Sequence, residues 1–214
     1  MSEKNVRLKA SGHVALDFSA LLRWHKIRGF FSIEEASAIQ LVVKTLPSGS
    51  HVAELGTFQG RSCVAIATAL PLGGILFCVD TFEGTILSPG QSRPPSADVV
   101  QTNLAALNAN LARFGVADRV RVFISTTHAA ASRFAPDSLG LLFIDAGHDY
   151  KNVRQDLIDW YPKLAPGGFL VCDDYVPEWP GVQQAIDESG LPGELIAPSL
   201  WMHHKPMQSE VEGV

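Results

Sequence analysis

Five short apolar segments recur along the chain, and their arrangement constrains the fold more than any other feature of the sequence. Stretches with helical periodicity lie between them. The segments are His51–Leu55, Ile75–Asp80, Val120–Ser125, Leu141–Asp145 and Phe169–Asp174. Short apolar runs of this kind are typical of buried parallel strands, because helices cover both faces of a parallel sheet. The alternation predicts an α/β fold with a Rossmann-like, doubly wound and mostly parallel sheet.

Two of the intervening helices carry signals for where they begin and end. Ser32 is followed three residues later by Glu35, which is the pattern of a capping box at a helix start. Another helical pattern begins near Ala97 and is closed by Gly115. Glycine favours the left-handed backbone conformation that ends many helices, so we expect this helix to stop there.

The last part of the chain is expected to complete the sheet. Residues 151–164 carry apolar side chains at helical spacing, and Ala165-Pro166-Gly167-Gly168 should stop this helix before the next strand. A short helix is expected around residues 182–188. Two further apolar segments, 194–196 and 200–202, lie on either side of Pro198 and predict a C-terminal antiparallel hairpin.

The length of 214 residues suits one α/β domain and is short for two. We assign residues 32–214 to this domain. Residues 1–31 lack clear periodicity and are interpreted as an N-terminal cap over the site or as a contact in a homo-oligomer. Residues 81–96 are rich in Gly, Pro and Ser and follow the second strand, where an α/β fold places ligand-facing loops. We therefore expect a lid there.

Charge and cysteine content narrow the classes of partner. The formal net charge is −5, and the densest basic group, residues 23–28, holds three cations. Nucleic acid is therefore not expected as a partner. The N-terminus is polar and the apolar runs are strand-sized, so we expect no membrane partner and a cytoplasmic protein. The dispersed Cys63, Cys78 and Cys172 are interpreted as small buried hydrophobic residues.

The first strand leads into a glycine turn that is followed at once by a helical pattern. The turn has the spacing G-x-x-x-G at Gly56 and Gly60, whereas a dinucleotide site needs G-x-G-x-x-G. Glu54, just before the turn, would repel a pyrophosphate but favour a ligand that carries ammonium and sulfonium groups. Asp80 ends the second strand, where a carboxylate can accept hydrogen bonds from ribose hydroxyls. These residues favour S-adenosylmethionine as the cofactor.

A polar stretch at the end of the third strand, Ser125–His128, is expected beside the adenine, although a threonine there could equally cap the next helix. The candidate cofactor-binding residues are Glu54, Gly56, Thr57, Phe58, Gly60, Ser62, Asp80, Thr81, Thr127, His128 and Asp145.

Three carboxylates follow the fourth and fifth strands. Asp145 ends the fourth strand, and Asp173 and Asp174 end the fifth. The carboxyl edge of an open α/β sheet holds the ligand crevice, so these acids should converge there and repel each other unless a cation intervenes. Oxygen ligands select a hard divalent ion, Mg²⁺ first, with Ca²⁺ or Mn²⁺ as alternatives. One of the paired acids could instead only cap a helix or point away.

These residues resemble a known family. The stretch Ile144-Asp145-Ala146-Gly147-His148-Asp149-Tyr150, followed by Pro166-Gly167-Gly168 and Asp173-Asp174-Tyr175, is similar to the pattern of antibiotic sugar O-methyltransferases. The wider group is the class I methyltransferases, and within it the metal-dependent small-molecule O-methyltransferases of the macrocin and catechol type. The resemblance spans about residues 32–205. Ala146 and Gly147 depart from it, because many relatives have Gly and an acid there.

The resemblance implies a site and a mechanism. Asp145, Asp173 and Asp174 would bind the divalent ion, and His148 falls where catechol-type enzymes place their catalytic lysine. The candidate catalytic residues are thus His148, as general base, and Asp145. The acceptor would be a hydroxyl of a sugar, a catechol-like ring or another natural product, as in antibiotic biosynthesis. Two alternatives stay open, a metal-independent methyltransferase and a non-catalytic nucleoside-binding module of the same fold.

Overall fold

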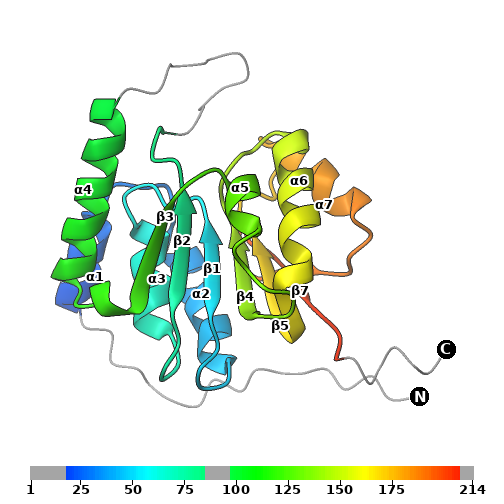
Figure 1. The fold of residues 1–214 in the computed structure, drawn as a ribbon, viewed down its shortest axis with the longest axis horizontal. Helices are drawn as coiled ribbons and strands as arrows, with labels where there is room; N and C mark the ends of the chain where they lie inside the picture. The colour runs from blue at the N-terminus through cyan, green and yellow to red at the C-terminus, as the bar shows by residue number, and fades with distance from the viewer. Residues whose placement is uncertain (1–17, 85–96, 208–214) are drawn as a thin grey trace.

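The computed structural model describes residues 18–84 and 97–207, with side chains from residue 22 onward. A central sheet lies between two layers of helices (Figure 1). The strands are β1 (Val52–Leu55), β2 (Leu76–Asp80), β3 (Val120–Ile124), β4 (Leu139–Ile144), β5 (Leu164–Cys172), β6 (Glu194–Leu195) and β7 (Trp201–His204). The helices are α1 (Phe18–His25), α2 (Ile33–Thr45), α3 (Arg61–Ala69), α4 (Ala97–Arg113), α5 (Thr127–Ala131), α6 (Tyr150–Trp160) and α7 (Pro180–Glu188).

The strand order β3-β2-β1-β4-β5-β7-β6 confirms the expected sheet. The first five strands are parallel. Strand β7 runs antiparallel to both β5 and β6, which confirms the C-terminal antiparallel hairpin expected from the sequence. The chain builds outward from β1 through β2 to β3, then returns to β4 on the other side of β1. Such a reversal opens a crevice at the carboxyl ends of β1 and β4.

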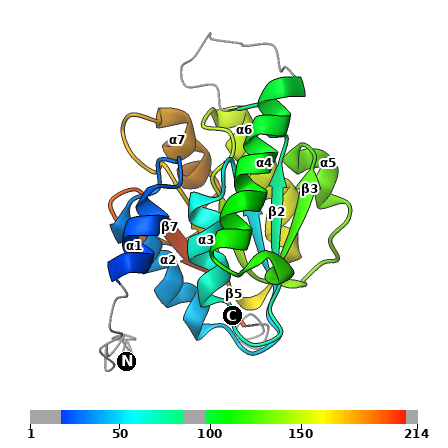
Figure 2. The ribbon, with the colours of Figure 1, turned by 90° about the vertical axis from the view of Figure 1, so that its left-hand side faces the viewer.

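Helices cover both faces of the sheet. Helices α1 to α4 lie on one face and α5 to α7 on the other, as the two perpendicular views show (Figure 1, Figure 2). Each side has an apolar core, with Ile39, Ile66 and Leu107 in the first and Leu157 and Trp160 in the second. The strands between these cores are therefore almost continuously apolar, which is why the sequence shows them as unbroken runs.

The helix signals are confirmed where the structure describes them. Glu35 N donates to the Ser32 side chain, and Ser32 N donates to the Glu35 side chain, so the expected capping box begins α2. Helix α4 ends at Arg113, and Gly115 follows with φ +65°. Within the described residues, no helix is long and apolar enough to cross a membrane.

The sequence misplaced the boundary between α6 and β5. The helix ends at Trp160, and a 3-10 turn occupies residues 161–163, because Pro162 lacks a backbone N–H and cannot continue the helix. Strand β5 then begins at Leu164, so the expected helix stop at residues 165–168 lies inside the strand. Leu164 pairs with Leu139 of β4, and the register shifts between Leu139 and Leu141 to accommodate the extra residues.

Part of the N-terminal segment packs into the domain. Trp24, Ile27 and Phe31 are buried in the core beneath α1 to α4, and the Trp24 indole N–H donates to the Arg61 carbonyl at 2.8 Å. The expected lid falls mainly on residues 85–96, which lie outside the described residues, as do residues 1–17.

Candidate active site

The glycine turn after β1 packs directly against the end of β4. Gly56 has φ +85°, and a Cβ built there would lie 1.9 Å from the carbonyl oxygen of Asp145. Gly60, with φ +88°, caps α3, and a Cβ there would meet Leu107 Cδ1 at 2.4 Å. No other residue type fits either place without displacing its neighbours. The spacing of the two glycines therefore reflects how closely the turn approaches the rest of the site.

Glu54 is fully buried beside this turn. Its Oε2 accepts hydrogen bonds from Thr57 Oγ1 at 2.9 Å and from Cys78 Sγ at 3.3 Å. Within residues 18–84 and 97–207, its Oε1 has no hydrogen-bond partner. Burial raises the pKa of Glu54 to about 7, although the nearby polar side chains of Ser62, Thr57 and Cys78 oppose this rise. Buried oxygens normally have partners, so Oε1 is available to a donor on a ligand.

Asp80, at the end of β2, ties the turn to the neighbouring strand. Its Oδ2 accepts hydrogen bonds from the backbone N–H groups of Thr57 and Phe58, both at 2.7 Å. Its Oδ1 accepts from Phe82 N at 2.6 Å. Phe58 has φ +49°, so this carboxylate also holds the turn in an uncommon backbone conformation. Asp80 therefore shapes the loop as well as offering a carboxylate at its rim.

The remaining candidate cofactor residues differ in their surroundings. Ser62 is buried in the first turn of α3, and Thr81, partly exposed, accepts a hydrogen bond from Glu83 N. Thr127 donates to Asp156, and His128 Nδ1 lies 2.6 Å from Asp159, so both side chains have partners on α6.

The capping alternative applies to Thr126. Its hydroxyl accepts a hydrogen bond from Ala129 N at the start of α5. This is the role the sequence left open for a threonine in the polar stretch 125–128. Contact of Thr127 and His128 with adenine stays a prediction.

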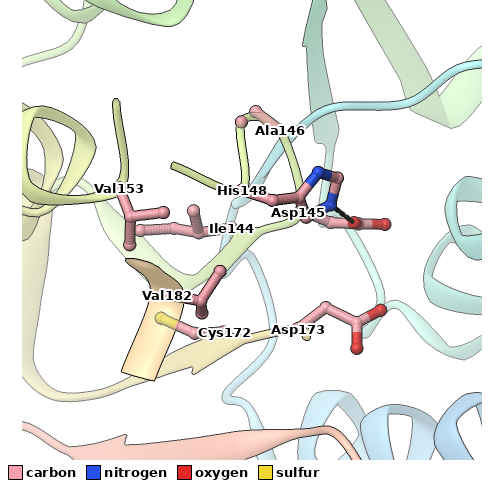
Figure 3. A pocket seen from close by; sticks show the side chains of 9 residues that line it. Ile144, Asp145, Ala146, His148, Val153, Cys172, Asp173 and Val182 are labelled. Carbon is pink, nitrogen blue, oxygen red and sulfur yellow. Dashed lines mark ion pairs between the residues drawn. The ribbon is translucent and has the colours of Figure 1, made fainter. Parts of the chain in front are cut away.

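The ends of β4 and β5 bring His148 between two carboxylates. His148 Nε2 lies 2.7 Å from Asp174 Oδ2 and 3.9 Å from Asp145 Oδ1. The carboxylate of Asp145 lies beside the His148 ring, and the carboxylate of Asp173 extends in the same direction as that of Asp145 (Figure 3). Ile144, Val153, Cys172 and Val182 form the apolar part of the lining.

The pKa values of His148 and Asp145 are shifted by burial and by the charges of their neighbours. Burial lowers the pKa of His148, but hydrogen bonds and charges from Asp145 and Asp174 outweigh it and raise that pKa to about 10. Burial raises the pKa of Asp145 well above its usual range, and the charges of Asp173 and Asp174 raise it further. The imidazolium of His148 thus compensates negative charge that is held at low solvent exposure.

Of the three predicted metal ligands, two converge with His148. Ligand atoms of Asp145, His148 and Asp174 all lie within 4.8 Å of one another. Asp173 differs, because its Oδ1 accepts hydrogen bonds from Ser199 Oγ at 2.6 Å and from Asp174 N at 2.7 Å. Burial raises the pKa of Asp173 to about 7. The donor set of two carboxylates and an adjacent imidazole fits a divalent cation.

Two neighbours of this cluster were not found from the sequence. The Trp179 ring stacks on the His148 ring, with centroids 4.6 Å apart, and Ser199 bonds Asp173 from the loop between β6 and β7. Trp179 precedes α7 in an irregular segment, and Ser199 lies in the turn of the hairpin. Neither position has a motif that could have marked it.

Known proteins share this sequence pattern and this fold. Residues 53–175 match the model of a family described as a methyltransferase domain. The chain belongs to this methyltransferase family. The match runs from within β1 to just beyond β5, and so includes the glycine turn, Asp80, His148 and all three carboxylates at the sheet edge.

One relative of this methyltransferase has a name that states its activity. It is 26% identical over 164 residues to mycinamicin III 3''-O-methyltransferase of Micromonospora griseorubida, which covers 68% of this chain and 63% of that protein. The chain thus spans less than two thirds of the length of this relative.

Solved structures agree on the fold. The O-methyltransferase NovP matches with a TM-score of 0.64 at 19% identity, over 82% of this chain and 81% of that one. TomG of Streptomyces achromogenes, an O-methyltransferase solved in complex with S-adenosylmethionine, matches with a TM-score of 0.62 at 17% identity, over 87% and 88%. The fold is therefore that of the class I S-adenosylmethionine-dependent methyltransferases, as the sequence predicted.

Proposed function

We propose that this methyltransferase transfers the methyl group of S-adenosylmethionine to a hydroxyl of a small acceptor, with a divalent cation bound at Asp145 and Asp174 and assisted by Asp173. The observation that carries the proposal is the contact between Gly56 and the Asp145 backbone. It places the glycine turn and the acidic edge against one another. A cofactor at the turn and an acceptor at the acids would then be neighbours.

The cofactor would lie across the ends of β1 and β2. Glu54 offers Oε1 to the ammonium group of the methionine part, and Asp80 offers a carboxylate to the ribose hydroxyls. A cation next to Glu54 lowers the cost of ionising this buried carboxyl, so binding should favour its charged form. Thr127 and His128 are proposed near the adenine, with their present hydrogen bonds to α6 holding the end of β3 in place.

The acceptor would lie over His148, Asp145 and Asp174. A bound divalent ion lowers the pKa of a coordinated hydroxyl and fixes its position. With a cation taking up the charge of Asp145 and Asp174, His148 would be neutral and would accept the proton that leaves the hydroxyl, with its Nε2 directed at the two carboxylates. Trp179 stacks on the imidazole and keeps the ring in this orientation. Positioning of the oxygen opposite the sulfonium then supplies much of the rate.

One observation favours a metal-independent alternative. His148 Nε2 lies 2.7 Å from Asp174 Oδ2, so a neutral His148 would be a base oriented by a carboxylate and would need no ion to orient the imidazole. Chelation separates the two mechanisms, because only the first loses turnover when divalent ions are removed.

The acceptor is proposed to be a natural-product hydroxyl, on a sugar or a catechol-like ring. The mycinamicin relative, whose name gives a 3''-O-methylation, supports this class. The test is incubation with methyl-labelled S-adenosylmethionine, Mg²⁺ and a panel of macrolide glycosides and catechols. Label in the hydroxyl of one class supports the proposal. Label on nitrogen or carbon atoms alone would overturn it.

A further inference from the structure

The Ser199 hydroxyl lies between two buried or partly buried carboxyl groups. Its Oγ is 2.6 Å from Asp173 Oδ1 and 2.5 Å from Glu35 Oε1. Glu35 and Ser199 are only 8% and 9% exposed. The three residues come from the first turn of α2, the loop between β6 and β7, and the end of β5. Residues far apart in the sequence thus meet at Asp173, next to the candidate metal ligand Asp174.

The Ser199 hydroxyl is the hydrogen-bond donor toward both carboxyl groups. A serine hydroxyl carries one hydrogen, so the two carboxyl groups compete for it. An ionised Asp173 only accepts hydrogen bonds, and its Oδ1 lies 2.6 Å from Ser199 Oγ. Ser199 is therefore the donor in the contact that bears on the candidate metal site.

Each of these three residues accepts a further hydrogen bond from a backbone N–H. Asp173 Oδ1 also accepts from Asp174 N at 2.7 Å, and no hydrogen bond to its Oδ2 is found among the described residues. The Ser199 carbonyl accepts from Tyr175 N at 3.0 Å. Glu35 Oε2 accepts from Ser32 N at 2.6 Å as part of the helix cap. One oxygen of Asp173 is therefore fixed, and the other is left available.

We propose that Ser199, supported by Glu35, is a positioning residue that fixes the Asp173 carboxylate so that Oδ2 serves the divalent cation. This inference rests on the proposed function, since it assumes a cation at Asp145 and Asp174. Carboxylates that bind metals are commonly oriented by such hydrogen bonds, and their loss weakens metal binding about 10- to 100-fold.

Four variants separate positioning from general stability. Ser199→Ala removes the hydroxyl, and Ser199→Thr keeps it. Glu35→Gln offers an amide N–H to Ser199 and an amide oxygen to Ser32 N, which leaves the serine hydrogen for Asp173, so the contact between Ser199 and Asp173 should be preserved. Ser132→Ala is the matched control, because its exposed hydroxyl donates to the Ala129 carbonyl of the same helical turn. Thermal unfolding and S-adenosylhomocysteine calorimetry establish that each variant is folded and binds cofactor.

The measurement is Mn²⁺ binding, followed by the electron paramagnetic resonance signal of the free ion. We expect Ser199→Ala to weaken Mn²⁺ binding at least about 10-fold. Ser199→Thr, Glu35→Gln and Ser132→Ala should stay within about threefold of the wild type, and cofactor affinity should be unchanged in all four. If folded Ser199→Ala binds Mn²⁺ with wild-type affinity, the role of Ser199 is overturned, but the metal-dependent function is not. Absence of Mn²⁺ binding by the wild type would overturn both the inference and the metal-dependent function.

Discussion

His148 Nε2 lies 2.7 Å from Asp174 Oδ2, and this ion pair joins the loop after β4 to the loop after β5. Asp174 adopts φ +59°, an uncommon conformation for a residue with a side chain. Strain of this kind gathers at functional sites, where the surrounding structure enforces it. The first prediction therefore concerns His148.

His148→Ala should lower kcat by roughly 10²- to 10⁴-fold, the usual contribution of a positioned base, while cofactor affinity stays nearly unchanged. A general base acts in its neutral form, so the wild-type rate should rise as pH increases through the His148 pKa and then level off. The two carboxylates raise this pKa in the absence of a cation, and a cation that takes up their charge should move the rise to lower pH. A variant with wild-type kcat and pH profile would reassign His148 to structure.

Turnover should depend on a divalent ion. Exhaustive chelation should abolish methyl transfer, and added Mg²⁺ should restore it, because Asp145 and Asp174 then regain their cation. Asp174→Ala should have the same effect on turnover without weakening cofactor binding. The matched control is Asp118→Ala, on the exposed turn before β3. Full activity after chelation would leave the metal-independent mechanism.

Glu54 should make stability depend on pH. Its pKa is about 7 in the folded chain and near 4.5 when exposed, so the folded state holds the proton more tightly. This contribution is fully present below pH 4.5 and is lost as pH rises through 7. Without cofactor, Glu54→Gln should therefore gain about 3 kcal/mol over the wild type between pH 4.5 and pH 8. Urea unfolding at several pH values measures the difference, and parallel curves would contradict it.

Gly56→Ala should destabilise the protein by more than about 2 kcal/mol and abolish cofactor binding, since a Cβ there meets the Asp145 carbonyl. Gly49 is the matched control. It also has a positive φ, +81°, but a Cβ there would have nothing within 4 Å. Gly49→Ala measures the conformational cost by itself, about 1 kcal/mol. Equal losses in the two variants would show that the contact with Asp145 is unimportant.

Elements with a local sequence pattern were predictable. Buried parallel strands are apolar on both faces, so β1 to β5 were visible, and the capping box at Ser32 and Glu35 is a local signal. The boundary before β5 was missed because Ala165-Pro166-Gly167-Gly168 has the composition of a turn, and only pairing of Leu164 with β4 makes it a strand.

The site was predictable in its location but not in its internal contacts. Parallel strands end at one edge, so the sequence placed Asp145 and Asp173 there. Two contacts could not be predicted, the hydrogen bond from Ser199 to Asp173 and the pairing of His148 with Asp174. They depend on side-chain rotamers and on the return of the chain through β6 and β7. No spacing in the sequence encodes those contacts, because they join residues brought together only by the tertiary fold.

The most direct measurement is calorimetric titration of the wild type and Asp80→Ala with S-adenosylhomocysteine. Asp80 supports the glycine turn through Thr57 and Phe58 and is the proposed ribose ligand. We expect the wild type to bind one equivalent of ligand, Asp80→Ala to bind more weakly by about 1–3 kcal/mol, and Asp118→Ala to match the wild type. No binding heat with the wild type, together with an unchanged thermal unfolding curve on adding ligand, would contradict the account.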